Sequence, residues 1–134
     1  MDSCIFCEIV KGNISCYKIY ENSETLVFLA PDQDVDGHMV AIPKHHFENV
    51  LDCDKSILHS FIDTVQIVSQ HCVKNCGYDG VNILNASDKS AGQSVNHLHF
   101  HIIPRNNGDN IDAWPVMNNH KYTLPEMQNK LEMR

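Results

Sequence analysis

Runs of apolar residues along the chain predict five short strands. The first two runs flank the turn-like Glu21-Asn22-Ser23 and predict a hairpin, and the third run ends at the strand breaker Pro43. The fifth run follows a polar loop and alternates strictly between polar and apolar positions. In chain order, the predicted strands cover residues 17–21, 24–30, 38–44, 80–86 and 96–105.

Helical spacing of apolar residues predicts one long helix and a short helix towards each end of the chain. Asp54 is the expected N-cap of the long helix, and Gly77 closes it. Its expected core face comprises Leu58, Phe61, Ile62, Val65, Val68, Cys72 and Cys76. The first short helix is expected within residues 4–13. The capping-box spacing of Thr123 and Glu126 predicts the last helix, with Leu124, Met127 and Leu131 along one face.

Strands that follow one another through short loops, together with a single long helix, are typical of an antiparallel α+β domain. The predicted fold is therefore a five-stranded antiparallel sheet with one long helix and short terminal helices. The 134 residues are 43% hydrophobic, and no repeat or linker divides the chain. We therefore expect a single domain that spans residues 1–134.

Charge and cysteine content narrow the class of protein. With a net charge of −7 and 10 Lys plus Arg, the chain lacks a basic surface, so we expect no nucleic-acid partner. No stretch resembles a secretion signal or reaches the roughly 20 apolar residues of a membrane span, which predicts a cytoplasmic protein without a membrane partner. In a reducing cytoplasm, the six cysteines favour thiols or metal ligands over disulfides.

The fifth predicted strand carries three histidines at alternate positions, His97, His99 and His101. Because successive side chains of a strand point to opposite faces, these rings share one face, while Leu98, Phe100 and Ile102 share the other. Such alternation also occurs in an ordinary half-buried strand. However, serine or threonine would fill a polar face without the repulsion between protonated imidazoles. The spacing therefore favours a functional cluster, either a metal site or a catalytic site.

Four motifs occur in order between residues 4 and 114. They are Cys4-Ile5-Phe6-Cys7, Gly37-His38 with Val40-Ala41-Ile42-Pro43-Lys44, Gly92-Gln93-Ser94-Val95, and His97-Leu98-His99-Phe100-His101-Ile102-Ile103. In this order and spacing, the chain resembles the histidine-triad nucleotide-binding family, and in particular its Hint-like branch. The resemblance implies a five-stranded antiparallel sheet that joins its copy across a two-fold axis, forming a homodimer with one continuous sheet.

Taken residue by residue, the resemblance implies a nucleotide site at the three histidines. His99, the middle one, would attack the α-phosphorus of a nucleotide and form a nucleotidyl-histidine intermediate, which water then hydrolyses. His101 and the loop Gly92-Gln93-Ser94 would stabilise the phosphoryl oxygens, the loop through its amides and hydroxyl. His38 would orient the triad. Asn85 would reach the ribose or the phosphate, or instead satisfy loop backbone at the end of its strand.

The same resemblance implies a metal site. Cys4 and Cys7 would bind structural Zn²⁺ together with His46 and His97. A zinc-bound His97 cannot pass a proton through its metal-bound nitrogen, so protonation of the leaving group would fall to His101, to His38 or to water. A competing ligand set lies on the long helix and comprises His71, Cys72 and Cys76.

The chain departs from the family pattern at Ala30, where an acidic residue usually binds the ribose hydroxyls; Asp32 lies two residues further on. The activity implied is hydrolysis or transfer at a nucleoside 5′-phosphoryl group, with a purine nucleoside phosphoramidate as the expected substrate and AMP or GMP as typical ligands. The alternatives are a dinucleoside polyphosphate hydrolase, a weakly active nucleotide-binding scaffold, and a zinc-binding module whose histidines serve only metal.

Overall fold

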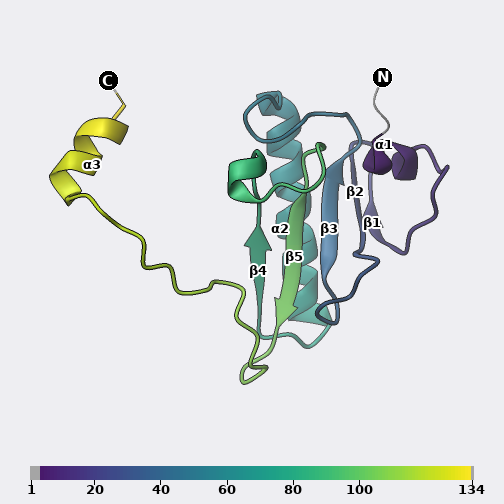
Figure 1. Cartoon of the computed structure of the whole chain (residues 1–134). Helices are drawn as coiled ribbons and strands as arrows, with labels where there is room; N and C mark the ends of the chain where they lie inside the picture. The colour runs from purple at the N-terminus through teal and green to yellow at the C-terminus, as the bar shows by residue number, and fades with distance from the viewer. Residues whose placement is uncertain (1–3, 134) are drawn as a thin grey trace.

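The computed structural model describes residues 4–133 and contains one five-stranded sheet with the order β1-β2-β3-β5-β4 (Figure 1). Every neighbouring pair of strands is antiparallel, which confirms the predicted architecture. The strands are β1 (Lys18–Glu21), β2 (Thr25–Leu29), β3 (Met39–Pro43), β4 (Gly80–Leu84) and β5 (Phe100–Arg105).

The three α-helices form where their spacing predicts them. They are α1 (Ile5–Val10), α2 (Lys55–Asn75) and α3 (Leu124–Leu131), and a single 3-10 turn, η1 (Lys89–Ala91), follows β4. The capping box between Thr123 and Glu126 is present at the start of α3. Asp54 is the N-cap residue of α2, although its side chain makes no capping hydrogen bond.

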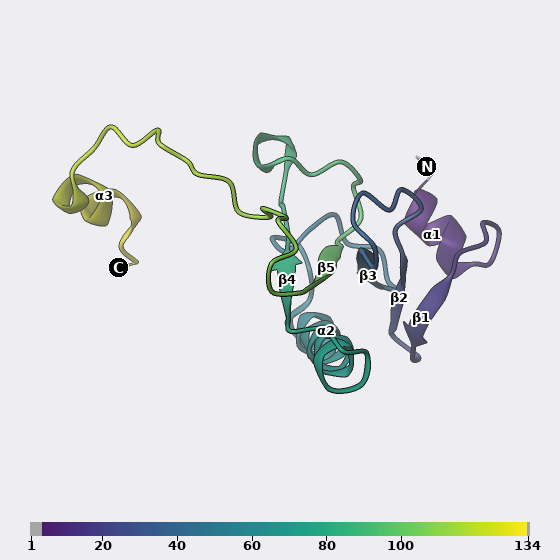
Figure 2. The ribbon, with the colours of Figure 1, turned by 90° about the horizontal axis from the view of Figure 1, so that it is seen from below.

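The long helix α2 covers one face of the sheet, and the larger hydrophobic core lies between them (Figure 2). Four of the predicted residues of α2 are buried in this core, Phe61, Val65, Val68 and Cys72, and the predicted Leu58 is partly buried against it. Two other residues of the predicted face are exposed instead: Ile62, with 45% of its surface accessible, and Cys76, which follows the last turn. The buried stripe is thus narrower than the apolar pattern predicts, because α2 contacts the sheet on one side only.

A second cluster covers the opposite face of the sheet, where α1 packs across β2 and β3 (Figure 2). Phe6 and Ile9 of α1 contact side chains that alternate with those of the first core, such as Leu26, Phe28 and Ile42. The period of two along these strands explains why both faces are apolar at this end of the sheet. The histidines share this α1 face, whereas Leu98 and Ile102 lie in the α2 core, as the alternation predicts.

The fifth strand begins later than predicted. Its pairing with β3 ends at Ala41 and Phe100, so His97 and His99 precede β5 instead of lying within it. A physical reason is Pro43 at the end of β3, which has no N–H with which to continue the ladder. The carbonyl of Pro43 accepts a hydrogen bond from the His97 ring instead.

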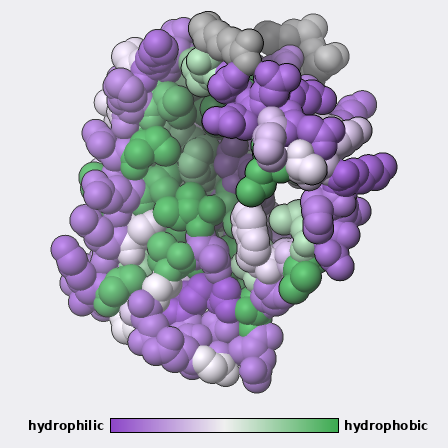
Figure 3. Space-filling view, turned by 90° about the vertical axis from the view of Figure 1, so that its left-hand side faces the viewer, coloured by the Kyte–Doolittle hydropathy of each residue, from purple (hydrophilic) through white to green (hydrophobic). Residues whose placement is uncertain are grey.

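The C-terminal part of the chain leads away from the sheet, and α3 lies apart from the other elements (Figures 1 and 2). The predicted apolar face of α3 is therefore largely accessible, with Leu124 87% and Leu131 68% exposed. Figure 3 shows the molecule from the side towards which the C-terminal part extends. Hydrophobic side chains (green) gather there in one area of the surface, with hydrophilic side chains (purple) around it. Within residues 4–133, no helix combines the length and hydrophobicity that a membrane crossing requires.

Candidate functional site

Four histidine rings from two parts of the sequence, His38 and the triad, meet near the start of β5. The rings of His99 and His101 lie 5.1 Å apart between centroids, and His38, just before β3, lies 5.0 Å from His101. Phe6 of α1 presents an edge contact to both His97 and His99, at 5.8 and 5.2 Å. The antiparallel pairing of β3 with β5 brings these residues together, since Val40 lies opposite His101.

His97 is completely buried and has both ring nitrogens engaged. Its Nε2 lies 2.9 Å from the Pro43 carbonyl, which only accepts, so Nε2 carries the proton and Nδ1 carries the lone pair. That lone pair faces Cys4 Sγ at 3.3 Å and His46 Nδ1 at 3.2 Å. Burial lowers the pKa of His97 to about 4, so the ring stays neutral near pH 7.

Cys4, Cys7, His46 and His97 form a group that can hold a metal ion. The four ligand atoms all lie within 4.8 Å of one another, and Cys7 Sγ lies 3.4 Å from His46 Nδ1. Burial and the neighbouring Cys4 raise the pKa of Cys7 to about 11, so a bound cation would have to stabilise its thiolate. Cys4 also caps α1, because its Sγ accepts from the Cys7 backbone N–H.

The competing metal set on α2 is not brought together. Within residues 4–133, the group containing Cys4 is the only cluster of three or more metal-ligating side chains with close ligand atoms. On α2, Cys72 is buried in the core and His71 is exposed, so the helix directs them away from each other. The six cysteines, all of which lie in the described region, are free thiols.

His99 has the opposite ring assignment from His97. Its Nδ1 lies 2.7 Å from the His97 carbonyl, so Nδ1 carries the proton and Nε2 carries the lone pair. The side chain is buried, with 7% of its surface exposed. A neutral imidazole with a fixed, unprotonated Nε2 is the form that can act as a nucleophile.

His38 connects His101 to an acidic residue. The Nδ1–H of His38 donates to Asp34 Oδ1 at 2.6 Å, and its Nε2 lies 2.8 Å from His101 Nδ1. Burial, together with His99 and His38, lowers the pKa of His101 to about 4. The hydrogen bond from His38 holds the pKa of Asp34 below its ordinary value. The three side chains form a continuous hydrogen-bonded chain.

The predicted phosphate loop follows η1, and its groups differ in availability. The backbone N–H groups of Gly92 and Gln93 donate to the carbonyls of Lys89 and Asp88, so both are already used within the loop. The Gln93 side chain is buried and braces the loop, donating to the Glu48 and Val95 carbonyls. Ser94 is exposed at the end of the loop. The contact of these residues with a phosphate stays a prediction.

Asn85 and Ala30 are the remaining predicted positions of interest. The Asn85 amide donates to the main-chain carbonyl of His99 at 3.0 Å, which matches the backbone-satisfying alternative for this residue. Ala30 is buried in the α1-face core, and Asp32 is exposed.

The sequence model of the HIT domain matches residues 11–108, a segment that includes the three histidines. The chain belongs to the HIT family. A relative in Schizosaccharomyces pombe, named adenosine 5′-monophosphoramidase, is 37% identical over 105 residues, covering 78% of this chain and 76% of that protein.

Solved HIT structures share the fold. A HIT family protein of Bacillus subtilis is 36% identical, with a TM-score of 0.83 over 96% of this chain and 92% of that one. A Zn-bound histidine triad protein of Mycobacterium smegmatis is 32% identical, with a TM-score of 0.77 over 83% of this chain and 81% of that one.

Sequence reasoning missed two contributors to this HIT site. The first is the Pro43 carbonyl, which sets the ring orientation of His97 and has no side-chain signal in the sequence. The second is Asp34, whose only signal is its position four residues before His38 in an acidic loop. Asp34 is exposed, yet the structure gives it a specific partner, the ring of His38.

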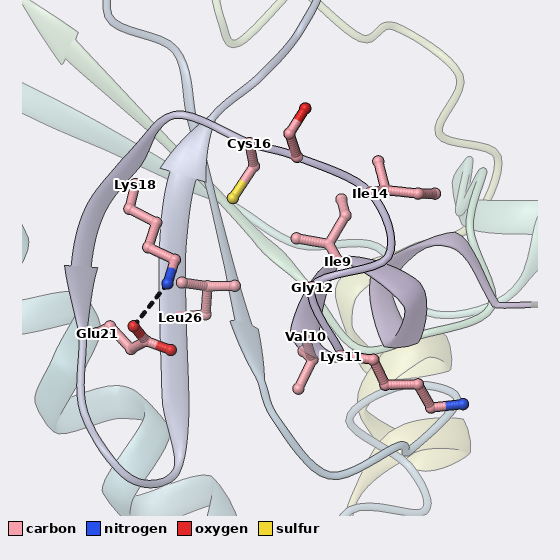
Figure 4. A pocket seen from close by; sticks show the side chains of 10 residues that line it. Ile9, Val10, Lys11, Gly12, Ile14, Cys16, Lys18, Glu21 and Leu26 are labelled. Carbon is pink, nitrogen blue, oxygen red and sulfur yellow. Dashed lines mark hydrogen bonds and ion pairs between the residues drawn. The ribbon is translucent and has the colours of Figure 1, made fainter.

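A hollow of about 260 Å³ lies between α1 and β1, away from the triad (Figure 4). Its lining includes Ile9, Cys16 and Leu26, and Lys18 forms a 2.9 Å ion pair with Glu21 beside them. No triad histidine lines this hollow, so it is separate from the candidate site.

Proposed function

We propose that the protein hydrolyses or transfers a nucleoside 5′-phosphoryl group, with a purine nucleoside phosphoramidate as substrate. The observation that carries the proposal is the fixed ring of His99, whose Nδ1–H donates to the His97 carbonyl at 2.7 Å. This bond leaves Nε2 as the only basic nitrogen available for attack on phosphorus. The phosphoramidase named in S. pombe supports the substrate class.

In the first half of the reaction, His99 Nε2 forms a bond to the α-phosphorus as the P–N bond breaks. The leaving nitrogen takes the electron pair of that bond and needs one proton to depart as an amine. His97 cannot supply it, because its Nε2–H is held by the Pro43 carbonyl and its Nδ1 faces the cysteines. We assign this proton to the pair of His101 and His38, which lies beside His99.

In the second half, water attacks the nucleotidyl-His99 phosphorus. A proton from that water returns to the His101 and His38 pair, and the P–N bond to His99 breaks with its electron pair going back to Nε2. The products are a nucleoside monophosphate and an amine, and the protein ends in its starting state. Dividing one displacement into two easier steps is the advantage of a covalent intermediate.

The phosphoryl oxygens need donors at a site with few cations. We assign this role to the hydroxyl of Ser94. The family resemblance adds His101, Gly92 and Gln93 as predictions, although the amides of Gly92 and Gln93 are bonded within the loop. His101 Nδ1 is bonded to His38, so the same Nε2–H that protonates the leaving amine would have to serve as this donor. Loss of one donor to a developing oxyanion typically lowers the rate by about 10²- to 10³-fold.

The metal we assign to the Cys4, Cys7, His46 and His97 group is zinc, in a structural role. With Zn–N of about 2.0 Å and Zn–S of about 2.3 Å, the ligand atoms of a tetrahedral site lie about 3.3 to 3.8 Å apart. The observed 3.2 Å between the two Nδ1 atoms and 3.3 to 3.5 Å between sulfur and nitrogen fit that geometry. Four protein ligands leave no open position, so the ion would link α1 to the histidine segment and not activate water.

We also propose a location, an assembly state and a ligand class for the protein. We propose a cytoplasmic homodimer that binds AMP- or GMP-like nucleotides and no nucleic acid. In the described part of the chain, β4 is the last strand at one end of the sheet. An edge strand presents main-chain N–H and C=O groups with which a second copy can pair, which supports the proposed dimer.

The test is release of AMP from adenosine 5′-phosphoramidate by the wild type and His99→Ala. We expect the variant to lose about 10⁴-fold or more in kcat, because no other group replaces the nucleophile. His59→Ala is the matched control, since His59 is exposed on α2, and it should retain wild-type activity. Comparable turnover by His99→Ala would contradict the proposal.

Ala30 supports one rival function, a weakly active nucleotide-binding scaffold. An alanine there offers no carboxylate to the ribose, and it is buried in the core. Tight AMP binding by a wild type that turns over neither adenosine phosphoramidate nor diadenosine polyphosphates would favour the scaffold. Preferential cleavage of diadenosine polyphosphates would assign the polyphosphate hydrolase activity instead.

A further inference from the structure

The hydrogen-bonded chain that begins at His101 ends at a carboxylate. His101 Nδ1 lies 2.8 Å from His38 Nε2, and His38 Nδ1 lies 2.6 Å from Asp34 Oδ1. The His38 side chain is only 12% exposed, whereas that of Asp34 is 67% exposed. The carboxylate therefore joins a mostly buried imidazole pair to the solvent.

We propose that Asp34 is a positioning residue that sets the tautomer of His38 and stabilises the proton which the His101 and His38 pair delivers. This inference rests on the proposed function, because it concerns the source of the proton for the leaving amine. Asp34 itself does not touch the reacting atoms and acts through His38.

The direction of each hydrogen bond follows from the carboxylate. An ionised Asp34 only accepts, so the proton of a neutral His38 is on Nδ1 and its Nε2 is an acceptor. His101 then donates its Nδ1–H to His38, which leaves a lone pair on His101 Nε2. In this state the pair can take a proton from the attacking water, but it cannot protonate the leaving group.

One added proton reverses the polarity of the pair. His38 becomes an imidazolium that donates through both nitrogens, to Asp34 and to His101 Nδ1. His101 then carries its proton on Nε2, the nitrogen not bonded to His38. When that proton moves to the leaving amine, the proton on His38 Nε2 moves to His101 Nδ1, and His38 returns to its neutral tautomer. One proton leaves the chain, and the attacking water restores it.

The two rings of the pair differ in their surroundings. The groups that face the pair are Asp34 from the loop before β3 and His99 from the segment before β5. Burial and these neighbouring imidazoles lower the pKa of His101 to about 4, so His101 alone does not retain a proton near pH 7. His38 is the ring next to the negative charge, and Asp34 therefore stabilises the cation where it forms.

The loop that carries Asp34 is held by its own hydrogen bonds. The Gln33 amide donates to the Ala30 and His38 carbonyls, and its Oε1 accepts from the Gly37 N–H. Gly37 has a φ of +87°, and a Cβ there would approach Pro104 to 2.9 Å, so the turn requires glycine. This bracing maintains the position of the carboxylate relative to His38.

Asp34→Asn and Asp34→Ala, with Asp36→Asn as the control from the same loop, test the inference. Asparagine keeps an acceptor for His38 and for the Val35 N–H but removes the charge. We expect Asp34→Asn to lower kcat on adenosine phosphoramidate by about 10- to 100-fold with little change in KM, as losses of groups that orient a functional histidine do. Asp36→Asn, exposed two residues further on, should stay within about twofold of wild type.

Nitrogen-15 NMR of the histidine rings gives a second readout that needs no turnover. We expect His38 to carry its proton on Nδ1 in the wild type and to shift towards Nε2–H in Asp34→Ala. An unchanged His38 tautomer in Asp34→Ala, or an Asp34→Asn kcat equal to that of Asp36→Asn, would overturn the inference. A wild type without turnover would refute the proposed function, and the ring spectra alone would then decide whether Asp34 sets the tautomer.

Discussion

His97 and His99 lie two residues apart, yet main-chain carbonyls bind opposite nitrogens of their rings. The Pro43 carbonyl accepts from Nε2 of His97, whereas the His97 carbonyl accepts from Nδ1 of His99. The unprotonated nitrogen of His97 is therefore Nδ1, the one nearer the main chain, and it lies among Cys4, Cys7 and His46. The unprotonated nitrogen of His99 is Nε2, at the far end of the ring, where it can attack a bound molecule.

The difference teaches that the role of a histidine here is set by a single backbone acceptor. The two rings are similarly buried, and both contact the edge of Phe6. Burial and residue type therefore do not separate them. The tautomer does, because it decides which lone pair is available and how far from the main chain it lies.

The largest expected effect on stability comes from a change at the group that His97 joins. Cys4→Ser should lower the zinc content from about one ion per chain to well below half, and Tm by about 10 °C or more, because the metal stabilises only the folded state. Metal analysis and thermal unfolding measure both quantities. Cys76→Ser is the control, since Cys76 is exposed and is not a member of the group.

The same variant sharpens the contrast with His99. The molecules of Cys4→Ser that remain folded should keep kcat on adenosine phosphoramidate within about tenfold of wild type, as expected for a structural ion. Wild-type zinc content and Tm in Cys4→Ser would contradict the metal assignment.

A second, smaller effect concerns His101, which is partly buried and neutral near pH 7. Its pKa is lowered to about 4 in the folded protein, against about 6.5 in the unfolded chain. Between these values the unfolded chain binds more protons, so the free energy of unfolding falls as the pH falls from about 6.5 to about 4. Above about pH 6.5, His101 adds no pH dependence.

His101→Gln should therefore flatten the decline of Tm with acidity, by on the order of 5 °C between pH 7 and 4.5. Thermal unfolding of the wild type and the variant across that range measures the difference. Release of the proposed zinc at low pH would affect both proteins, so the difference between the two curves reports on His101. Parallel curves for the two proteins would show that His101 does not titrate as its burial requires.

The smallest expected effect concerns Asn85, whose amide donates to the carbonyl of His99. Asn85→Ala should lower kcat by about three- to tenfold and leave KM for the nucleotide substrate nearly unchanged, because one hydrogen bond of about 1 kcal/mol is lost. Steady-state kinetics separate the two parameters. A raised KM with unchanged kcat would instead support the predicted contact of Asn85 with the ribose or phosphate.

Apolar runs predicted β2 and β3, because these strands bury side chains on both faces of the sheet. Alternation along the fifth predicted strand assigned the histidines to the face opposite Leu98 and Ile102. The alternation did not locate the start of β5, which depends on where β3 can no longer donate hydrogen bonds to β5. That end point follows from the position of Pro43 in the folded sheet.

The candidate site was predictable only in part. The family resemblance implied the set of Cys4, Cys7, His46 and His97, and the structure brings these four side chains together. The roles of the two nitrogens of each ring were not predictable, since backbone carbonyls determine them and every residue has one. Asp34 was missed because the acidic loop contains three aspartates, and only the turn at Gly37 determines which one meets His38.

The stereochemical course at phosphorus tests the central claim, attack by His99 Nε2, most directly. A nucleoside thiophosphoramidate that is chiral at phosphorus is hydrolysed in isotopically labelled water, and the configuration of the product is determined. Two in-line displacements, first by His99 and then by water, each invert the phosphorus, so the account predicts overall retention. Inversion would mean that water attacks the substrate directly and would contradict a nucleotidyl-His99 intermediate.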